Sequence, residues 1–276
     1  MESQEKRDIK VARLQFRKYI LLIIGIWVGS WYPMGISLFL FYNMYIKADL
    51  PVYASFGGVF SDLRYIVVAI STPFLFIVLY LFRLVFLAFL TKIAVLLVNR
   101  ESPPSEMVAA TGIGENESRM ISAYWARGAI LRLLKWSFVK SPFPWLATWA
   151  FNFVGVNKFG KNTVVEDGFL CQEFLETENN VYIGPGSIVS SHLVEGSYGA
   201  ITLKKIKINE NAVLSGLNGI SPGCLIERDV HLMPMSGMIK FSKTKPQGKY
   251  LGVPIMKVSR NRYRRLMKIP AGLEEI

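Results

Sequence analysis

The feature that most constrains the fold of this chain is a six-residue repeat in its C-terminal half. Every sixth residue of one stretch is a branched aliphatic: Ile208, Leu214, Ile220, Ile226 and Leu232. An α-helix repeats about every 3.6 residues and a strand about every 2, so neither element produces this spacing. A period of six is typical of a parallel β-helix, in which about six residues cover each flat face and about eighteen complete a coil. The repeated aliphatics are therefore expected to point inward and to stack from coil to coil.

A second run with the same period precedes the first, at Phe159, Val165, Cys171, Thr177, Ile183 and Val189. Between Val189 and Ile208 the count slips by one residue. The slip falls on residues 190–207, which must bulge or loop out of the regular coil. Loops on a rigid scaffold frequently carry function, although a tolerated insertion is the alternative interpretation of this segment.

The N-terminal part of the chain is too apolar for an ordinary soluble domain. Residues 19–45 and 65–82 carry no charge, and apolar residues continue to Val98 around Arg83. Runs of this length cross a hydrocarbon layer of about 30 Å, so residues 1–100 are expected to form a two-span transmembrane anchor. Arg83 is expected either to snorkel to the headgroups or to mark the point where the helix leaves the bilayer. A cleaved signal peptide is the alternative for the first run, which is longer than the apolar core of a signal.

The basic residues that give the chain a net charge of +12 are unevenly distributed. The N-terminal segment and the chain after Arg100 are basic, whereas the loop at 47–64 is neutral. The positive-inside rule therefore places the N-terminus and the β-helix of this multi-pass membrane protein in the cytoplasm. Ten lysines or arginines and no acid lie between residues 240 and 268. With apolar spans present, this run favours the anionic leaflet of a membrane as partner, and no nucleic acid is expected.

The remaining segments complete the expected domain organisation. Residues 101–118 read as a polar linker, and residues 119–155 as an amphipathic helix followed by an apolar segment. Because all six tryptophans precede the β-helix, this helix is expected to lie in the membrane interface, with packing against the β-helix as the alternative. Residues 156–258 are expected to form the β-helix and residues 259–276 a basic tail. The fold class is therefore membrane α plus all-β.

The chain has only two histidines, which makes the search for chemistry short. His192 lies in the slipped segment, and Glu195 follows three residues later. A neutral imidazole can act as a general base, and a carboxylate can orient it; a histidine on a surface turn is the alternative. His231 directly precedes the inward Leu232 and is expected to be structural. Two histidines do not supply the three imidazoles of a zinc hydrolase, so no metal is expected.

The β-helix with His192 resembles the hexapeptide-repeat acyltransferases, whose domain is a left-handed parallel β-helix. Residues 117–258 are more similar to the membrane-linked C-terminal units of poly-lysine synthase-type non-ribosomal peptide synthetases. The segments that match are 124–136, 153–155, 160–162, 183–184, 191–195, 208–232, 234–236 and 250–254. Ile255 stands where that family usually has alanine, and its acidic stretch is matched only loosely by residues 173–178. No adenylation or carrier domain is present, which excludes a complete peptide synthetase.

The resemblance implies an acyltransferase. It implies transfer of an acyl or aminoacyl group from an acyl-CoA or a carrier-protein thioester to the hydroxyl or amine of a small-molecule acceptor. His192 is then the base and Glu195 its orienter. Residues expected to contact the thioester co-substrate, as walls of its channel or as partners of CoA phosphates, are Gly252, Pro254, Lys243 and Lys245. A solvated basic tail is the alternative interpretation of the two lysines.

The resemblance also implies an assembly. In the similar family three units come together and sites form in the clefts between them, so one unit per chain implies a homotrimer. Six membrane helices around the axis would then hide Arg83 from lipid. The alternative of another class is a non-catalytic scaffold that assembles a membrane complex. A scaffold would leave His192 shallow and unpaired, whereas an enzyme would place it in a cleft.

Overall fold

The structure, a computed structural model, describes residues 16–109, 115–171, 173–195, 200–266 and 268. The chain divides into two compact units, Phe16–Ala94 and Val95–Ile276, the latter together with the terminal segment Met1–Gln15. The basic residues expected at the N-terminus before Phe16, and the end of the basic tail beyond 268, lie outside the described residues.

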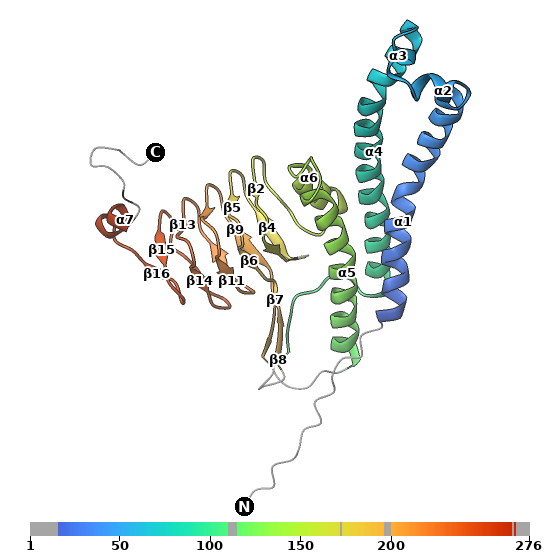
Figure 1. Cartoon of the computed structure of the whole chain (residues 1–276). Helices are drawn as coiled ribbons and strands as arrows, with labels where there is room; N and C mark the ends of the chain where they lie inside the picture. The colour runs from blue at the N-terminus through green and yellow to red at the C-terminus, as the bar shows by residue number, and fades with distance from the viewer. Residues whose placement is uncertain (1–15, 110–114, 172, 196–199, 267, 269–276) are drawn as a thin grey trace, which may run out of the picture. The chain divides into compact units, whose positions relative to one another are not determined.

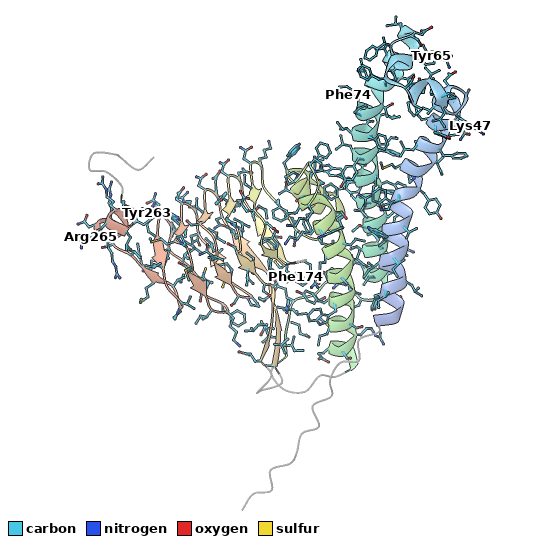
Figure 2. The ribbon with its side chains drawn as sticks, in the orientation of Figure 1. Lys47, Tyr65, Phe74, Phe174, Tyr263 and Arg265 are labelled. Carbon is cyan, nitrogen blue, oxygen red and sulfur yellow. The ribbon has the colours of Figure 1, made fainter. Side chains whose placement is uncertain are left out.

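The unit Phe16–Ala94 is built on two long helices joined by short helical turns (Figure 1). The elements are α1 (Phe16–Phe41), a π-helix η1 (Tyr42–Ile46), a 3-10 turn η2 (Lys47–Asp49), α2 (Leu50–Tyr53), α3 (Phe56–Val59) and α4 (Leu63–Glu101). The residues of α4 from Val95 onward belong to the second unit. Figure 2 shows the apolar side chains that α4 leaves uncovered, among them Phe74, which is 65% exposed.

Both helical stretches are long and apolar enough to cross a membrane, over Tyr19–Tyr53 and Leu63–Glu101. This finding rests on length and composition alone, and core helices of soluble proteins and signal sequences also meet it. The neutral segment predicted as a loop at 47–64 forms short helices instead.

Arg83 does not extend away from the helix pair, as a snorkelling arginine would. Helix α4 continues through it, its side chain is 3% exposed, and its Cζ lies 3.7 Å from the ring centroid of Trp31 in α1. A guanidinium over an indole face is a favourable cation–π contact. Arg83 is therefore buried within a single chain, with Trp31 over its guanidinium, and its burial does not by itself require further copies.

Three parallel sheets wind into a coil within the described part of residues 156–258 (Figure 1). The first contains β2 (Val164–Val165), β5 (Tyr182–Ile183), β10 (Val213–Leu214), β13 (His231–Leu232) and β15 (Lys249–Leu251), with β16 (Met256–Lys257) antiparallel at its edge. The second contains β3 (Phe169–Leu170), β6 (Ile188–Val189), β11 (Gly219–Ile220) and β14 (Gly237–Met238). The third contains β4 (Leu175–Thr177), β9 (Ile206–Ile208) and β12 (Leu225–Ile226).

The register of these sheets confirms a parallel β-helix with eighteen residues per coil. Leu214 pairs with Leu232, Ile220 with Met238, and Ile208 with Ile226. All five aliphatics of the regular repeat are buried. One earlier position was predicted wrongly: Leu170, and not Cys171, pairs with Val189. Strand β3 comes one position early, because Leu170 lies five positions after Val165 and Thr177 lies seven positions after Leu170. The left-handed sense of the coil stays a prediction.

One corner of the coil is formed by residues with left-handed backbone. Asn162, Asn180, Asn211 and Asp229 have φ between 56° and 57°. Asparagine and aspartate tolerate this conformation better than other residues with a Cβ. Their side chains also bond from coil to coil, as in the contact of 3.0 Å from Asn211 Nδ2 to Asp229 Oδ1. Short polar side chains thus turn the chain once per coil.

The slipped segment 190–207 leaves the coil as an antiparallel hairpin, β7 (His192–Glu195) and β8 (Ala200–Leu203). Tyr182 pairs with Val213, 31 positions later, so this coil holds 13 residues beyond the usual eighteen. Strand β1 (Met107–Ala109) pairs with β8. The predicted linker 101–118 therefore contains regular structure, because β1 lies within it and α5 begins at Glu115.

Helix α5 (Glu115–Val139) and helix α6 (Leu146–Val154) precede the coil. The apolar face of α5 is buried, including Leu131, Leu134 and Phe138. The ring of Phe151 in α6 lies 5.8 Å from that of Phe159 at the start of the coil. Packing against the β-helix is thus the observed arrangement of α5, while Trp136 stays 59% exposed. At the other end, helix α7 (Arg260–Leu266) is the first part of the predicted basic tail.

Candidate functional site

His192 lies at the first position of β7, where the chain leaves the coil. Its ring is half-buried against α5, with centroids 5.6 Å from that of Tyr124 and 5.2 Å from that of Trp125. Its Nδ1 lies 2.9 Å from Tyr124 Oη and 3.4 Å from Ser190 Oγ. The hairpin therefore presents the imidazole to an aromatic face of α5.

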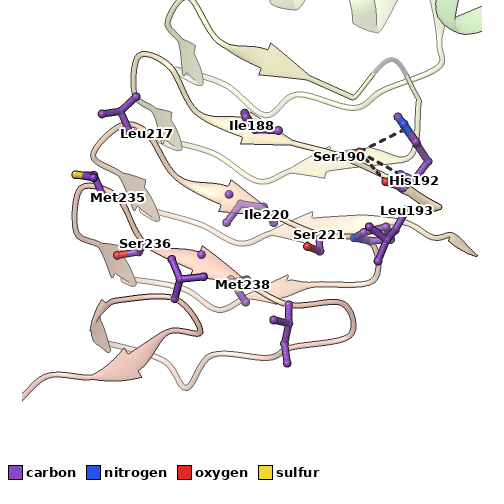
Figure 3. A pocket seen from close by; sticks show the side chains of 15 residues that line it. Ile188, Ser190, His192, Leu193, Leu217, Ile220, Ser221, Met235, Ser236 and Met238 are labelled. Atoms are coloured by element: carbon purple, nitrogen blue, oxygen red, sulfur yellow. Dashed lines mark hydrogen bonds between the residues drawn. The ribbon is translucent and has the colours of Figure 1, made fainter. Parts of the chain in front are cut away.

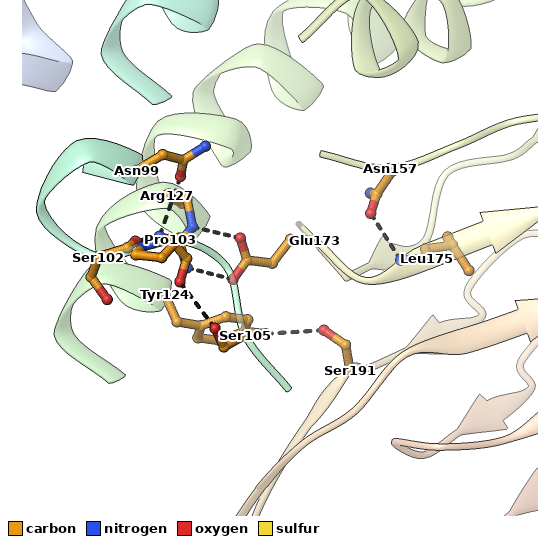
Figure 4. A network of polar contacts seen from close by, with 10 residues as sticks. All are labelled: Asn99, Ser102, Pro103, Ser105, Tyr124, Arg127, Asn157, Glu173, Leu175 and Ser191. Atoms are coloured by element: carbon orange, nitrogen blue, oxygen red, sulfur yellow. Dashed lines mark hydrogen bonds and ion pairs between the residues drawn. The ribbon is translucent and has the colours of Figure 1, made fainter. Parts of the chain in front are cut away.

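Tyr124 contacts both the imidazole of His192 and a second hydroxyl, and one arrangement of protons among them suits a general base. Tyr124 Oη also lies 3.2 Å from Ser191 Oγ (Figure 4). If Tyr124 donates to Ser191, its oxygen accepts from Nδ1–H, and Nε2 of His192 then carries the free lone pair. This is the tautomer that a general base requires, and Tyr124 is the group that can hold it.

Burial sets the charge state of this cluster. It lowers the pKa of His192, and the nearby guanidinium of Arg132 lowers it further, so the imidazole is neutral near pH 7. Burial raises the pKa of the Tyr124 hydroxyl and raises that of the Cys171 thiol to about 12. Tyr124 and Cys171 are therefore protonated, and His192 is the group of this cluster that can accept a proton.

Glu195 does not reach His192. Its carboxylate accepts two hydrogen bonds from Lys240 Nζ, at 2.8 Å and 2.7 Å. Side chains alternate along a strand, so residues three apart point to opposite faces. Spacing in the sequence suggested the pair, but the β conformation of 192–195 separates the two side chains. The orienting role predicted for Glu195 does not fit this geometry.

An open groove of about 500 Å³ adjoins His192 (Figure 3). Its floor is formed by Gly219 and Gly237, which are paired across β11 and β14. A Cβ added at Gly219 would meet nothing within 4 Å, so the missing side chain is what leaves the floor open. Its other lining residues are mostly apolar or hydroxyl-bearing: Ile188, Ser190, Leu193, Leu217, Ile220, Ser221, Pro222, Met235, Ser236, Met238, Ile239 and Val253.

One edge of the groove is a ridge of apolar side chains, Leu217, Met235 and Val253, placed eighteen residues apart. These side chains are between 63% and 73% exposed. Leu217 and Met235 adopt φ of 49° and 60°, a conformation that is uncommon for large residues. The coil therefore holds three large apolar groups outward beside an open floor.

None of the four residues predicted to contact a thioester lines the groove. Gly252 has φ of 94° and follows β15, and a cis peptide joins Val253 to Pro254. Val253, between them, lines the groove, whereas Gly252 and Pro254 do not. Lys243 and Lys245 are exposed and are not among the lining residues.

Behind the site, a buried ion pair joins α5 to the coil (Figure 4). Arg127 Nε donates to Glu173 at 2.6 Å and Nη1 donates to the Ser102 carbonyl at 2.8 Å. Burial raises the pKa of the Glu173 carboxyl, and the contact with Arg127 acts against this. Tyr124 lies one helical turn before Arg127, and its ring stacks on that of Phe174. The sequence did not predict that Tyr124, Arg127 and Glu173 lie together beside His192.

His231 forms a separate contact. Its Nδ1 lies 2.6 Å from Tyr263 Oη of α7, and its Nε2 bonds Ser215 of the preceding coil. Tyr263 packs with Met233 and Val258 at the end of the coil. His231 thus connects two coils to α7. Within the described ranges, no group of three or more His, Cys, Asp or Glu side chains is placed to hold a metal ion.

The register and repeat define this part of the chain as a hexapeptide-repeat parallel β-helix. No protein-family model matches the chain, and no curated protein sequence matches it. A hexapeptide-repeat-containing acetyltransferase from Vibrio cholerae is similar in structure, with a TM-score of 0.42, 14% identity, and coverage of 48% of this chain and 89% of that one.

Two further solved structures are similar. A maltose O-acetyltransferase from Clostridium difficile has a TM-score of 0.33, 17% identity, and coverage of 63% of this chain and 86% of that one. A variant of an N-acyltransferase from Bacillus cereus, in complex with dTDP-4-amino-4,6-dideoxyglucose and coenzyme A, has a TM-score of 0.31, 16% identity, and coverage of 42% and 78%. At these TM-scores the likeness carries no conclusion about the reaction of this chain, which depends on its own residues.

Proposed function

We propose that this chain is an acyltransferase that moves an acyl or aminoacyl group from a thioester to the hydroxyl or amine of a small acceptor. The observation that carries the proposal is the position of His192. Its imidazole is neutral near pH 7, is held at Nδ1 by Tyr124, and adjoins an apolar groove. A general base needs a neutral ring, a fixed tautomer and access to substrate.

In the proposed step, one proton passes from the acceptor through His192 to the departing thiolate. His192 Nε2 takes the proton of the acceptor hydroxyl or amine while its oxygen or nitrogen attacks the thioester carbon. The carbon–sulfur bond then breaks, and the imidazolium returns the proton to the departing thiolate. Tyr124 keeps its contact with Nδ1 throughout and so holds the ring orientation.

The donor is an acyl-CoA or a carrier-protein thioester, and the groove receives its arm. A groove with a glycine floor and no charged lining residue suits the uncharged, extended part of such a donor. Lys243 and Lys245 are exposed on the last coils and are proposed as partners of CoA phosphates. Gly252 and Pro254 flank the groove residue Val253 and are proposed to fix its position.

A non-catalytic scaffold is the competing function. A scaffold requires neither a half-buried, hydrogen-bonded imidazole nor an open floor beside it. Both features are present at His192, which favours the enzyme.

We also propose a membrane location. The two apolar helices would form the anchor, and the N-terminus and the β-helix would face the cytoplasm beside an anionic leaflet. The similarity to poly-lysine synthase-type units belongs to the same proposal. An impermeant thiol reagent tests the topology on intact cells. It should label a cysteine at the exposed Ser55 and not one at the exposed Ser259, and the reverse pattern would refute the orientation.

The test of the reaction is His192→Ala, with His231→Ala as the control for loss of a histidine. Thioester turnover should fall by about 10²–10⁴ in His192→Ala, which is the usual effect of removing a general base. Because its pKa is lowered, the parent should lose activity only as the pH falls through a value below the ordinary His value of about 6.5. Equal turnover by His192→Ala and the parent would end the proposal.

A further inference from the structure

A small crevice, separate from the groove, also meets His192. It lies between α5 and the first coils, and its lining residues are Tyr124, Trp125, Gly128, Arg132, Phe169, Cys171 and His192. His192 is the one residue that the two lining sets share. The crevice holds about 20 Å³, enough for roughly one water-sized group. A single hydroxyl or amine fits there, and a larger group must remain at the mouth.

Arg132 is the charged residue at this crevice, and its guanidinium is free. Among the described residues it forms no ion pair or hydrogen bond and is exposed. Nearby cations are engaged: Arg127 and Lys135 of the same helix with Glu173 and the Gly168 carbonyl, and Lys140 just after it with Asp167. A solvated arginine is the ordinary explanation of such a residue, but this one is beside the imidazole and beside two aromatic rings.

Those rings make the mouth of the crevice a favourable place for an anion. Trp125 and Phe169 are 37% and 36% exposed, so each keeps a partly open face beside Arg132. A guanidinium beside partly apolar surface binds a carboxylate or phosphate more strongly than it would in bulk water. Arginine binds both anions through paired N–H groups.

We infer that the acceptor substrate carries a carboxylate or phosphate that Arg132 binds, while its hydroxyl or amine enters the crevice beside His192. This inference rests on the proposed acyltransferase function and names the class of acceptor. The donor then approaches His192 from the groove and the acceptor from α5, so the two substrates need not compete for one space. A bound anion would also offset the positive charge of Arg132, and His192 would become a stronger base when the acceptor is present.

The experiment measures anion binding directly, on the full chain in detergent. The chain has only two histidines, so selectively labelled imidazole signals can be assigned with His231→Gln. Inorganic phosphate is the probe, and the pKa of His192 is followed with and without it. Groups that face this ring and can alter the result are Tyr124 and Arg132 of α5 and Cys171 of the coil. Phosphate should raise the pKa of His192 by about half a unit in the parent, because a nearby anion favours the charged form.

Arg132→Gln should abolish this rise, and Arg119→Gln, the loss of another exposed arginine on α5, should leave it intact. The signal of His231 should be the same in all variants, which reports that the coil is folded. No rise in the parent, or an equal rise in Arg132→Gln, would overturn the inference. Thioester turnover by the parent is measured separately with acetyl-CoA. Anion binding without any turnover would count against the acyltransferase proposal and not against the site.

Discussion

Tyr124 and His192 lie 68 positions apart in the chain, and the contact between Tyr124 Oη and His192 Nδ1 is the residue contact on which the proposed chemistry depends. Tyr124 is presented by a helix and His192 by a hairpin. Their meeting depends on the docking of α5, which the buried pair of Arg127 and Glu173 fixes one turn further along. The chemistry proposed for His192 is therefore supported by residues that carry no chemistry themselves.

Arg127→Met should destabilise the protein by about 3–5 kcal/mol, because it leaves the carboxylate of Glu173 buried without its partner. The measurement is the free energy of unfolding in detergent, followed by tryptophan fluorescence. Lys140→Met is the control, since it breaks a pair with Asp167 in which both side chains are more than half exposed. Surface pairs contribute at most about 1 kcal/mol. Equal losses of unfolding free energy in the two variants would contradict the role of Arg127 in holding α5 to the coil.

At the element scale, the hairpin β7–β8 carries His192 out of the regular coil. It adds 13 residues at one corner, and strand β1 completes it as a sheet. The pair of Glu106 and Lys204, with Nζ to Oε2 of 2.5 Å, joins the same two segments. The chain that follows α4 is thus attached to the hairpin that carries His192.

The groove depends on one strand position, Gly219 of β11. Gly219→Leu should weaken binding of a thioester such as acetyl-CoA about tenfold or more, since the new side chain would occupy the floor. The fold should tolerate it, because a Cβ at this position meets no atom within 4 Å. Val164→Leu, at an exposed strand position of another sheet, is the control and should bind as the parent does. Unchanged affinity in Gly219→Leu would place the thioester elsewhere.

At the scale of the whole molecule, the groove is open on one side and the ridge beside it is exposed. Leu217, Met235 and Val253 are exposed side by side on this edge, and apolar surface of this kind often marks a contact with a partner. We propose that a neighbouring copy supplies the second wall and covers the ridge, as in the homotrimer that the resemblance implies. The burial of Arg83 within one chain removes a separate argument for that assembly.

Native mass spectrometry in mild detergent should give a trimer for the parent. Met235→Lys should shift it toward the monomer, because a charge would replace an apolar group of the ridge, whereas Val164→Lys should not. A parent that is monomeric at low detergent would contradict the proposed homotrimer, and the groove would then have to function with a single wall.

The repeat of aliphatics was enough to predict the β-helix from the sequence alone. Wherever the strands follow one another regularly, each face takes six residues and the same position points inward. The five aliphatics placed every sixth residue from Ile208 to Leu232 are all buried, as the repeat predicts. The slip of one residue also marked where the chain leaves the coil, although it gave no indication of a hairpin. Where one strand comes a position early within a coil of the usual length, as at Leu170 and Cys171, the period by itself is not sufficient.

The site was decided by tertiary structure. His192 was found from the sequence because it is one of two histidines in an irregular segment, but its partner was not. Glu195 is near in sequence and is turned away by strand alternation, while Tyr124 is distant and is brought close by the packing of α5. Spacing predicts contacts only within one element. Contacts between a helix and a coil depend on which faces pack together, and that is fixed by buried apolar and ionic groups spread over the chain.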